Sequence, residues 1–491
     1  MSSEAMTNLD VLFPAPTLPP SVLSPQRFPG ASIESLAALQ YVLKDNHKKW
    51  HIFVNDLKFH NHITHRALAL YALGSNGAPI RTFYQQDAQT QRPVIEPPEA
   101  ITSTNFFEHL QDARYYLAYV AFFSKEVDDK GATRVLEEYI FSETYRSQDS
   151  ALNQPEMLNL FLSGLLHAFI HVGHGLEFGL KGMVVEGLAL MAVHDPDGKN
   201  IFPPSFFDSV PQAAEEQVTR LLLSLTLDRK VVDDCVLTTN DTHVFDIIAR
   251  ILKDDHLRVE CVQHSGKEYK RAVNEHGPAI RQYVAQWTIN MTRPGEVERK
   301  IEELSWACTI LYAIGGFDEA KGFAAEFFLM HLVTSSLFLP SVIAYLTPRS
   351  QALLLRGYLS TVLTWWVSRG RPALNIKSFM ALTSAQPTSP TFQRHVGEIT
   401  VEKEVPNTFL PIIQSAILHP NDHLPKIQRS FAHFSALYGR RPAGYFDSTE
   451  LEGAELLDGS LFFRAARLTM DYMGWVREGQ PAKMWHMGGF F

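Results

Sequence analysis

The chain has 491 residues, of which 45% are hydrophobic and 20% are charged, so it has enough apolar sequence to bury a large core. Its formal net charge is −9 and it contains no run rich in lysine and arginine. This composition argues against a nucleic acid or an anionic membrane as a partner. The chain has three cysteines, Cys235, Cys261 and Cys308, and no CxxC pair. A disulfide framework or a cysteine-based zinc site is therefore not expected.

The first 30 residues are rich in proline and do not have the basic and apolar segments of a signal peptide. We expect residues 1–30 to form a flexible tail or a strap over the surface. The longest apolar stretches, such as residues 327–339, are too short and too polar to span a bilayer. We therefore expect a cytoplasmic protein in which residues 31–491 form the folded domain.

Apolar residues recur at helical spacing along most of the chain. Ser32 is the expected N-cap of the first helix, and Gly74 is the expected end of the second. Residues 398–405 alternate as a strand does. The predicted helices span residues 33–46, 60–73, 113–123, 155–172, 184–194, 213–225, 244–253, 278–292, 297–313, 320–338 and 351–368. The sequence thus predicts an all-α fold, a single large multi-helix domain with irregular connections.

Histidine is frequent, with 20 residues, and several of them cluster within predicted helices. His62 and His65 are three residues apart, which would place them on one helix face. His167 and His171 are four residues apart, and His174 follows three residues later. One face of that helix would therefore present three imidazoles in succession.

His331 stands in an apolar stretch that predicts a helix buried on nearly all sides. A buried imidazole needs a partner, because an unpaired buried polar group costs roughly 1–3 kcal/mol. The ordinary partner is a backbone carbonyl or a hydroxyl group, and the alternative is a divalent metal. Three histidine clusters in one helical chain favour the metal, and imidazoles without thiolates suit iron, manganese or zinc. The other histidines, His194 and His423 among them, have polar or loop surroundings and are expected at the surface or in structural roles.

Two further features have both a functional and a structural interpretation. Gly173, Gly175 and Gly179 superficially match a phosphate-binding loop, but a helix rather than a strand is predicted before them. We expect these glycines to let two helices or a substrate approach closely. Lys377 is by default a surface residue. Its functional alternative is a buried neutral amine, which can react with carbon dioxide to form a carbamate, an oxygen ligand for a metal.

The chain resembles the questin oxidase-like family of fungal polyketide pathways over about residues 35–475. The stretches that carry the resemblance are, in this order, FHNHITHRALALYALG, HAFIHVGHGLEFGLKGMVVEGLALMAVH, FFLMHLVTSSLFLPS and WWVSRGRP. The resemblance implies an enzyme that opens anthraquinone rings oxidatively. It is strongest to a non-haem iron dioxygenase whose iron is held by four histidines and a carboxylated lysine.

Carried onto this sequence, the resemblance implies that the iron ligands are His167, His171, His331, one of His62 and His65, and a carboxylated Lys377. His174, or the other histidine of the N-terminal pair, would act as general base on a phenol. The implied cofactor is Fe(2+), with NADPH as an external reductant of the quinone. The implied partners are an aromatic polyketide and dioxygen.

Two rival functions remain open from the sequence. The first is an NADPH-dependent Baeyer–Villiger oxidase on the same class of substrate, since some members of the family are described in this way. The absence of a dinucleotide-binding fingerprint weighs against direct binding of a nicotinamide. The second is a non-catalytic helical binding protein whose histidines are satisfied by internal hydrogen bonds.

Overall fold

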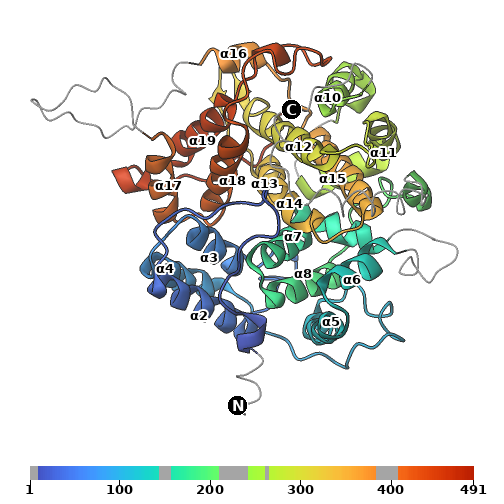
Figure 1. Cartoon of the computed structure of the whole chain (residues 1–491), viewed down its shortest axis with the longest axis vertical. Coiled ribbons are helices and arrows are strands. Elements are labelled where there is room, and N and C mark those ends of the chain that lie inside the picture. Colours follow the sequence, from blue (N-terminus) through green and yellow to red (C-terminus); the bar gives the residue numbers. More distant parts are fainter. Residues whose placement is uncertain (1–8, 143–155, 210–240, 260–264, 383–406, 491) are drawn as a thin grey trace, which may run out of the picture.

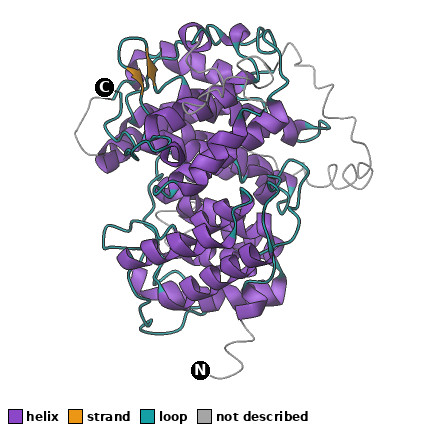
Figure 2. Cartoon of the chain, turned by 90° about the vertical axis from the view of Figure 1, so that its left-hand side faces the viewer, coloured by secondary structure: helices purple, strands orange, loops and turns teal. Residues whose placement is uncertain are grey.

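The computed structural model describes residues 9–142, 156–209, 241–259, 265–382 and 407–490. Helices make up nearly all of the regular structure in these ranges, so the prediction of an all-α fold is confirmed (Figures 1 and 2). The single sheet among the described residues is a short antiparallel hairpin of β1 (Phe317–Asp318) and β2 (Gly322–Phe323), in which Phe317 lies opposite Phe323.

The α-helices fall into an N-terminal and a C-terminal group. The first group is α2 (Ile33–Lys49), α3 (Ile63–Ala72), α4 (Gly77–Asp87), α5 (Tyr116–Lys130), α6 (Ala132–Leu136), α7 (Glu156–Phe178) and α8 (Lys181–Val193). The second group is α10 (Val244–Lys253), α11 (Ser265–Gln286), α12 (Glu296–Ala313), α13 (Phe327–Ser336), α14 (Leu339–Ile343), α15 (Pro348–Ser368), α16 (Ile376–Met380), α17 (Phe409–Leu418), α18 (His423–Tyr438) and α19 (Ser460–Met473).

Shorter turns connect these helices. The 3₁₀ turns are η1 (Ala88–Thr90), η2 (Ala113–Tyr115), η5 (Pro204–Ser209), η6 (Asp255–Leu257), η7 (Ala454–Leu456) and η8 (Val476–Glu478), and η3 (Glu137–Phe141) is a π-helical turn.

Several predicted helix ends are confirmed. Ser32 caps α2 by accepting a hydrogen bond from the backbone N–H of Ser35, and Gly74 follows α3 with a φ of 79°. The helix predicted at 60–73 starts only at Ile63, because the backbone N–H of Asn61 instead bonds the carbonyl of Ile52. The helix predicted at 320–338 starts at Phe327, because the β-hairpin occupies the preceding residues. The predicted helix at 213–225 and the predicted strand at 398–405 lie outside the described residues.

The N-terminal segment from residue 9 to residue 30 is a packed strap. Phe13 is fully buried, with its ring 5.3 Å from that of His47 on α2. The backbone N–H of Thr17 bonds the carbonyl of Phe178 at the end of α7, and the hydroxyl groups of Ser24 and Ser341 are 2.9 Å apart. Of the two predicted alternatives for this region, residues 9–30 therefore follow the strap.

Helix α7 is the central helix of the fold (Figure 1). Its residues Met157–Phe178 are long and apolar enough to cross a membrane by length and composition, but they are packed inside the protein. The helix packs against α8. A Cβ atom added at Gly173 would lie 2.5 Å from Cβ of Phe338, and one added at Gly175 would lie 2.6 Å from Val184 of α8. The glycines therefore permit close packing of neighbouring segments, as the sequence predicted.

Four helices from distant parts of the chain meet at the centre of the molecule. Helix α3 contacts α18, α18 contacts α13, α13 contacts α7, and α7 contacts α3 (Figure 1). These four contacts close a ring. The ring brings together the predicted histidine clusters of α3, α7 and α13, and it adds α18, on which no site residue was predicted.

A buried ion cluster fixes the start of α13. Arg369 of the WWVSRGRP stretch is fully buried, and its Nε donates to Oε1 of Glu326 at 2.9 Å. The same guanidinium is paired with Glu268 of α11. Glu326 in turn caps α13 by accepting a hydrogen bond from the N–H of Leu329. The position of His331, just over one turn further along α13, therefore depends on Arg369.

We expect Arg369→Met to destabilise the protein by roughly 3–5 kcal/mol, because it leaves two buried carboxylates without this guanidinium. The measurement is the midpoint of denaturant-induced unfolding. The control is Arg258→Met, whose native side chain is 75% exposed, and which should change stability by less than about 0.5 kcal/mol. Equal midpoints for Arg369→Met and the unmodified protein would contradict the structural role of this cluster.

Candidate metal centre

A small buried cavity lies inside the ring of α3, α7, α13 and α18. It has room for about one water molecule. Its apolar wall is Ala69, Ile170, Leu337 and Phe338. Its polar lining is His65, His167, His174, His331, Thr334, His423, Lys426 and Arg429. The structure thus brings together histidines from all three predicted clusters, and it adds His423, for which a surface or ordinary structural role was predicted.

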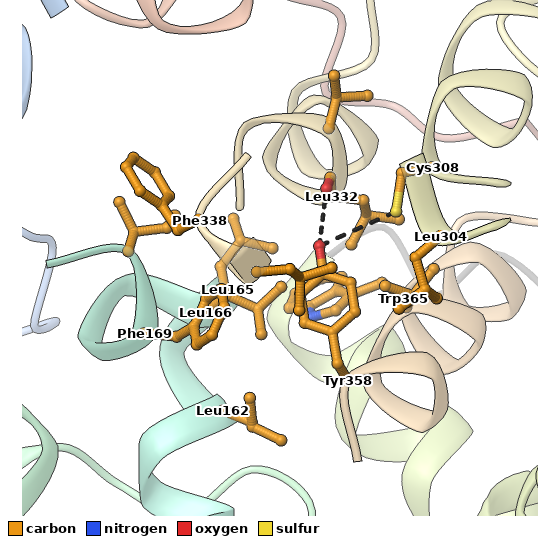
Figure 3. Close-up of a cluster of buried hydrophobic side chains, with 14 of the residues drawn as sticks. Leu162, Leu165, Leu166, Phe169, Leu304, Cys308, Leu332, Phe338, Tyr358 and Trp365 are labelled. Carbon is orange, nitrogen blue, oxygen red and sulfur yellow. Dashed lines mark hydrogen bonds between the residues drawn. The ribbon is translucent and has the colours of Figure 1, made fainter. Parts of the chain in front are cut away.

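A left-handed turn inside α7 sets the position of His167. Gly164, Leu165 and Leu166 have φ values of 56°, 56° and 66°, a conformation that costs roughly 1–2 kcal/mol for each non-glycine residue. The turn directs the carbonyl of Gly164 at Nδ1 of His167, at 2.6 Å. Leu165 and Leu166 lie in the same cluster of buried side chains as Phe338, which helps to hold the turn (Figure 3). The uninterrupted helix predicted at 155–172 did not include this turn.

Gly164 itself is required by its surroundings. A Cβ atom at this position would lie 2.3 Å from Nε2 of His194. The rings of His194 and His167 both stack with that of His60, with centroids 5.2 and 3.8 Å from it. The turn and this histidine stack therefore fit each other.

The ring nitrogens of His62 and His167 face each other in an unusual way. Nδ1 of His62 lies 2.9 Å from a carboxylate oxygen of Asp422, and Nδ1 of His167 lies against the carbonyl of Gly164. These acceptors assign the proton of each neutral ring to Nδ1, which leaves a lone pair on each Nε2. The two Nε2 atoms are nevertheless only 2.8 Å apart. Two facing lone pairs repel each other unless a proton or a metal cation lies near both.

A metal cation near both Nε2 atoms removes this repulsion without an imidazolium. Burial lowers the pKa of His62, and it lowers the pKa of His167 well below its usual value, so an imidazolium is disfavoured at both. Two imidazoles bound at right angles to one metal, with bonds of about 2.1 Å, place their nitrogens roughly 3 Å apart. Ligand atoms of His60, His62 and His167 all lie within 4.8 Å of one another.

Two further histidines present unused nitrogen atoms. His331 donates from Nδ1 to the carbonyl of Phe327 at 2.8 Å, and Nδ1 of His423 lies 2.9 Å from Asp422. The Nε2 atoms of both rings are buried and have no hydrogen-bond partner among the described residues. The centroid of the His331 ring lies 5.0 Å from that of His423 and 5.2 Å from that of His167. Anchoring of Nδ1 with a free Nε2 is the usual state of a metal-binding histidine.

Asp422 organises one side of the cavity. Its carboxylate contacts His62, His423 and Lys426 at 2.9 Å each. Although burial raises the pKa of Asp422, the nearby His423 and Lys426 outweigh this effect and hold the pKa well below its usual range. Burial lowers the pKa of Lys426, although Asp422 partly opposes that shift. A single buried carboxylate therefore orients two imidazoles and an amine.

His65 and His171, both predicted as metal ligands, lie in a hydrogen-bonded chain. Nε2 of His65 is 3.0 Å from Nδ1 of His171, and Nε2 of His171 is 3.0 Å from Glu186. The other oxygen of Glu186 is 2.6 Å from Nδ1 of His47 on α2. Burial raises the pKa of Glu186, but hydrogen bonds from His171 and His47 prevail and lower it to about 2. Protein groups bond both nitrogens of His171, so neither nitrogen is free to bind a metal. These hydrogen bonds instead fix the orientation of the His65 and His171 rings.

His174, the predicted general base, lines the cavity. Its Nδ1 lies 3.0 Å from the carbonyl of Ile170, which makes Nε2 the proton acceptor. Its ring lies against those of His65 and Phe338, with centroids 4.9 and 4.3 Å away. Burial lowers the pKa of His174 well below its usual value, and nearby Arg429 lowers it further. The imidazole is therefore neutral, with a lone pair on Nε2.

Lys377 does not lie with the histidines. Its side chain is exposed on α16, at the top of Figure 1, whereas α3, α7, α13 and α18 lie at the centre. The predicted buried position of Lys377 is therefore wrong. The buried lysine at the cavity is Lys426, which is 8% exposed. Its spacing of three residues from His423 on one helix was the signal that could have identified both.

The buried histidines make stability depend on pH. Burial holds the pKa of each of these side chains well below 6.5 in the folded state, and they are His60, His65, His167, His174 and His331. The unfolded chain takes up protons at these positions below pH 6.5. Their stabilising contribution is therefore complete above pH 6.5 and is lost as the pH falls below it.

We expect chelator-treated protein to lose up to about 1.4 kcal/mol per buried histidine between pH 6.5 and about pH 5.5. The measurement is the thermal unfolding midpoint across this range. Replacement of the exposed His256 by Gln should leave the slope unchanged. A midpoint that stays constant over this pH range would contradict the assignment of neutral imidazoles.

The chain matches the family model described as Questin oxidase-like over residues 59–431, a range that contains every residue lining the cavity. The Baeyer-Villiger monooxygenase AacuH of Aspergillus aculeatus is 25% identical over 492 aligned positions, which cover 94% of this chain and 90% of that protein. The Baeyer-Villiger oxidase ptaJ of Pestalotiopsis fici is 25% identical, with 89% and 88% covered. The questin oxidase of Aspergillus fumigatus is 27% identical, with 70% and 73% covered. The chain therefore belongs to the questin oxidase-like family.

Proposed function

We propose that the chain is a non-haem iron-dependent oxygenase that cleaves a C–C bond of an anthraquinone-type polyketide ring with dioxygen, in fungal secondary metabolism. The names of its relatives, questin oxidase and Baeyer–Villiger oxidase, support an oxidoreductase that acts on such a ring. The observation that supports a metal is the 2.8 Å distance between Nε2 of His62 and Nε2 of His167. The proton of each ring is assigned to Nδ1, so neither Nε2 carries a proton.

The residues that we propose to hold iron are His62, His167, His331 and His423, together with Lys426. Three of these histidines belong to the set implied by the resemblance. His62 rather than His65 fills the position from the N-terminal pair, and His423 takes the place of His171, because the nitrogens of His65 and His171 bond each other and Glu186. Imidazoles with an oxygen ligand and no thiolate suit iron. Iron(II) bound there supplies the activation of dioxygen and a Lewis acid for the substrate oxygen.

Lys426 can supply the oxygen ligand as a carbamate. Burial lowers the pKa of its amine, which increases the neutral fraction that can attack carbon dioxide. The new N–C bond yields a carbamate and releases one proton. The resemblance implies a carboxylated lysine, and Lys426 is the lysine that lines the cavity. We therefore assign this role to Lys426 in place of Lys377.

The remaining residues of the cavity would handle the substrate and its proton. His174 presents Nε2 as an acceptor for the proton of a phenol. Ile170, Leu337 and Phe338 form an apolar wall of the cavity. The hydrogen bonds that run from His65 through His171 and Glu186 to His47 fix the orientation of the His65 ring, which lines the cavity.

A Baeyer–Villiger oxidase that consumes NADPH is the second candidate, because several relatives carry that name. It would insert one oxygen atom from dioxygen and oxidise one NADPH per turnover. The iron-dependent oxygenase would insert two oxygen atoms. The two candidates share the substrate class and differ in oxygen stoichiometry.

We expect protein purified without chelator to contain about one iron per chain, with four histidines and one lysine as ligands. Incubation of this protein with a hydroxyanthraquinone under labelled dioxygen should place two labelled oxygen atoms in the product. Mass spectrometry of the product and metal analysis of the protein are the measurements. One labelled atom with stoichiometric NADPH oxidation would favour the second candidate, and full activity without iron would exclude the first.

We expect Lys426→Ala to lower iron content and to reduce activity by at least about 100-fold, because it removes a proposed ligand. Lys377→Ala is the matched control, since that side chain is exposed on α16, and it should keep the iron content and rate of the unmodified protein. Metal analysis and initial rates of both variants are compared. If Lys426→Ala retains its iron and Lys377→Ala loses it, the assignment of the lysine is wrong.

A further inference from the structure

One buried carboxylate near the cavity, that of Glu186 on α8, is not among the proposed iron ligands. Residues 182–193 of α8 are all buried, and Glu186, which is 2% exposed, is the one charged side chain in this otherwise apolar stretch. Burial of an ionised carboxylate is unfavourable unless hydrogen bonds offset it. Tyr116 of α5, which lies near Glu186, is a neutral phenol because burial raises its pKa, so it adds no charge.

Both oxygens of Glu186 face imidazoles, and this fixes the direction of each hydrogen bond. Although burial raises the pKa of Glu186, hydrogen bonds from His171 and His47 lower it to about 2, so the carboxylate is ionised and can only accept. Nε2 of His171 therefore donates to Oε2 at 3.0 Å, and Nδ1 of His47 donates to Oε1 at 2.6 Å. A neutral His171 then has its lone pair on Nδ1, which accepts from Nε2 of His65 at 3.0 Å. This leaves a lone pair on Nδ1 of His65, whose ring lines the cavity.

Three imidazoles in and beside the cavity differ in how well they can hold a positive charge. Burial lowers the pKa of His65 well below its usual value, and His174 and His171 lower it further. His174 has the carbonyl of Ile170 as the partner of its Nδ1, and nearby Arg429 disfavours a positive charge there. His171 instead bonds an ionised carboxylate directly. Of these three rings, His171 is therefore the one on which an additional proton is best stabilised.

We propose that His65, His171 and Glu186 form a proton relay that takes up a proton from the cavity and later returns it. An O–H group in the cavity, such as that of a water molecule, gives its proton to Nδ1 of His65, and the oxygen keeps the electron pair. The Nε2 proton of His65 moves to Nδ1 of His171, and Glu186 stabilises the resulting imidazolium. The reverse steps return the proton, so a full cycle consumes none. The reaction that uses this proton rests on the proposed function, whereas the relay rests on these hydrogen bonds.

Two substitutions of Glu186 separate its charge from its hydrogen bonds. Glu186→Gln keeps the length of the side chain and its capacity for two hydrogen bonds, but it removes the charge. Glu186→Asp keeps the charge and shortens the side chain, which weakens both hydrogen bonds. If Glu186 only orients the rings, Glu186→Gln should be the milder change. If Glu186 stabilises a proton on the relay, Glu186→Asp should be the milder change.

The first measurement requires no turnover. Chelator-treated, full-length protein with isotope-labelled histidine is titrated with acid and followed by NMR, and thermal unfolding midpoints check that each variant is folded. We expect His171 to take up a proton before His65 and His174 do. Glu186→Gln should lower the proton affinity of His171 by about 10- to 100-fold, and Glu186→Asp should lower it less. Glu34→Gln, which changes an exposed residue of α2, is the control and should have no effect.

The second measurement is the steady-state rate of ring opening with a hydroxyanthraquinone. Glu186→Gln should lower kcat by about 10- to 100-fold, keep KM within about 3-fold and leave the iron content unchanged. Glu186→Asp should keep a larger part of kcat, and Glu34→Gln should keep all of it. His47→Gln keeps both a donor for Oε1 and the charge of Glu186, so it should also keep most of kcat.

Three outcomes would overturn the relay. The first is an equal proton affinity of His171 in the unmodified protein and in Glu186→Gln. The second is full activity of Glu186→Gln together with loss of activity in Glu186→Asp, which would leave Glu186 an orienting role only. The third is a loss of kcat in His47→Gln that added imidazole restores, because the proton would then leave to solvent through His47, whose side chain is 16% exposed.

The NMR titration separates this inference from the proposed function. If the protein opens no anthraquinone ring, and Glu186→Gln still lowers the proton affinity of His171, the proposed function fails and the relay stands. If ring opening requires iron, and Glu186→Gln changes neither the titration nor kcat, the proposed function stands and the relay fails.

Discussion

The candidate site depends on the enforced approach of two imidazole nitrogens, Nε2 of His62 and Nε2 of His167, to 2.8 Å. Each ring is held from behind, by Asp422 in one case and by the Gly164 carbonyl in the other. The protein thereby creates a point of high electron density in a buried, low-dielectric interior, where a cation is strongly stabilised. The free Nε2 atoms of His331 and His423 add to the same effect.

This arrangement requires strained backbone angles and buried charges, which the packing of the surrounding core stabilises. Leu165 and Leu166 adopt left-handed backbone angles at a position where their side chains are packed among other buried residues (Figure 3). Arg369 is buried with two carboxylates so that α13 begins at a fixed place. Strain and buried charge therefore concentrate around the helices that carry the histidines, as is common where a site must be pre-organised.

Helices α7 and α18 supply most of the polar side chains that line the cavity. Helix α7 contributes His167 and His174, whereas α18 contributes His423 and two basic residues, Lys426 and Arg429, which line the same cavity. Each basic residue has one acidic partner, Asp422 or Glu177. The cavity is thus polar at its ligands and apolar along Ile170, Leu337 and Phe338.

The sequence by itself determined the all-α class and most helix positions, because apolar periodicity is a local property of the chain. The grouping of His167 and His331 with one of His62 and His65 was implied by the family resemblance. The sequence did not determine the left-handed turn at Gly164, since that conformation is stabilised by packing against distant segments. Nor did it distinguish Lys426 from Lys377, or His423 from the surface histidines. Only the tertiary structure decided these points, because burial and the direction of a ring nitrogen depend on contacts among α3, α7, α13 and α18, which lie far apart in the chain.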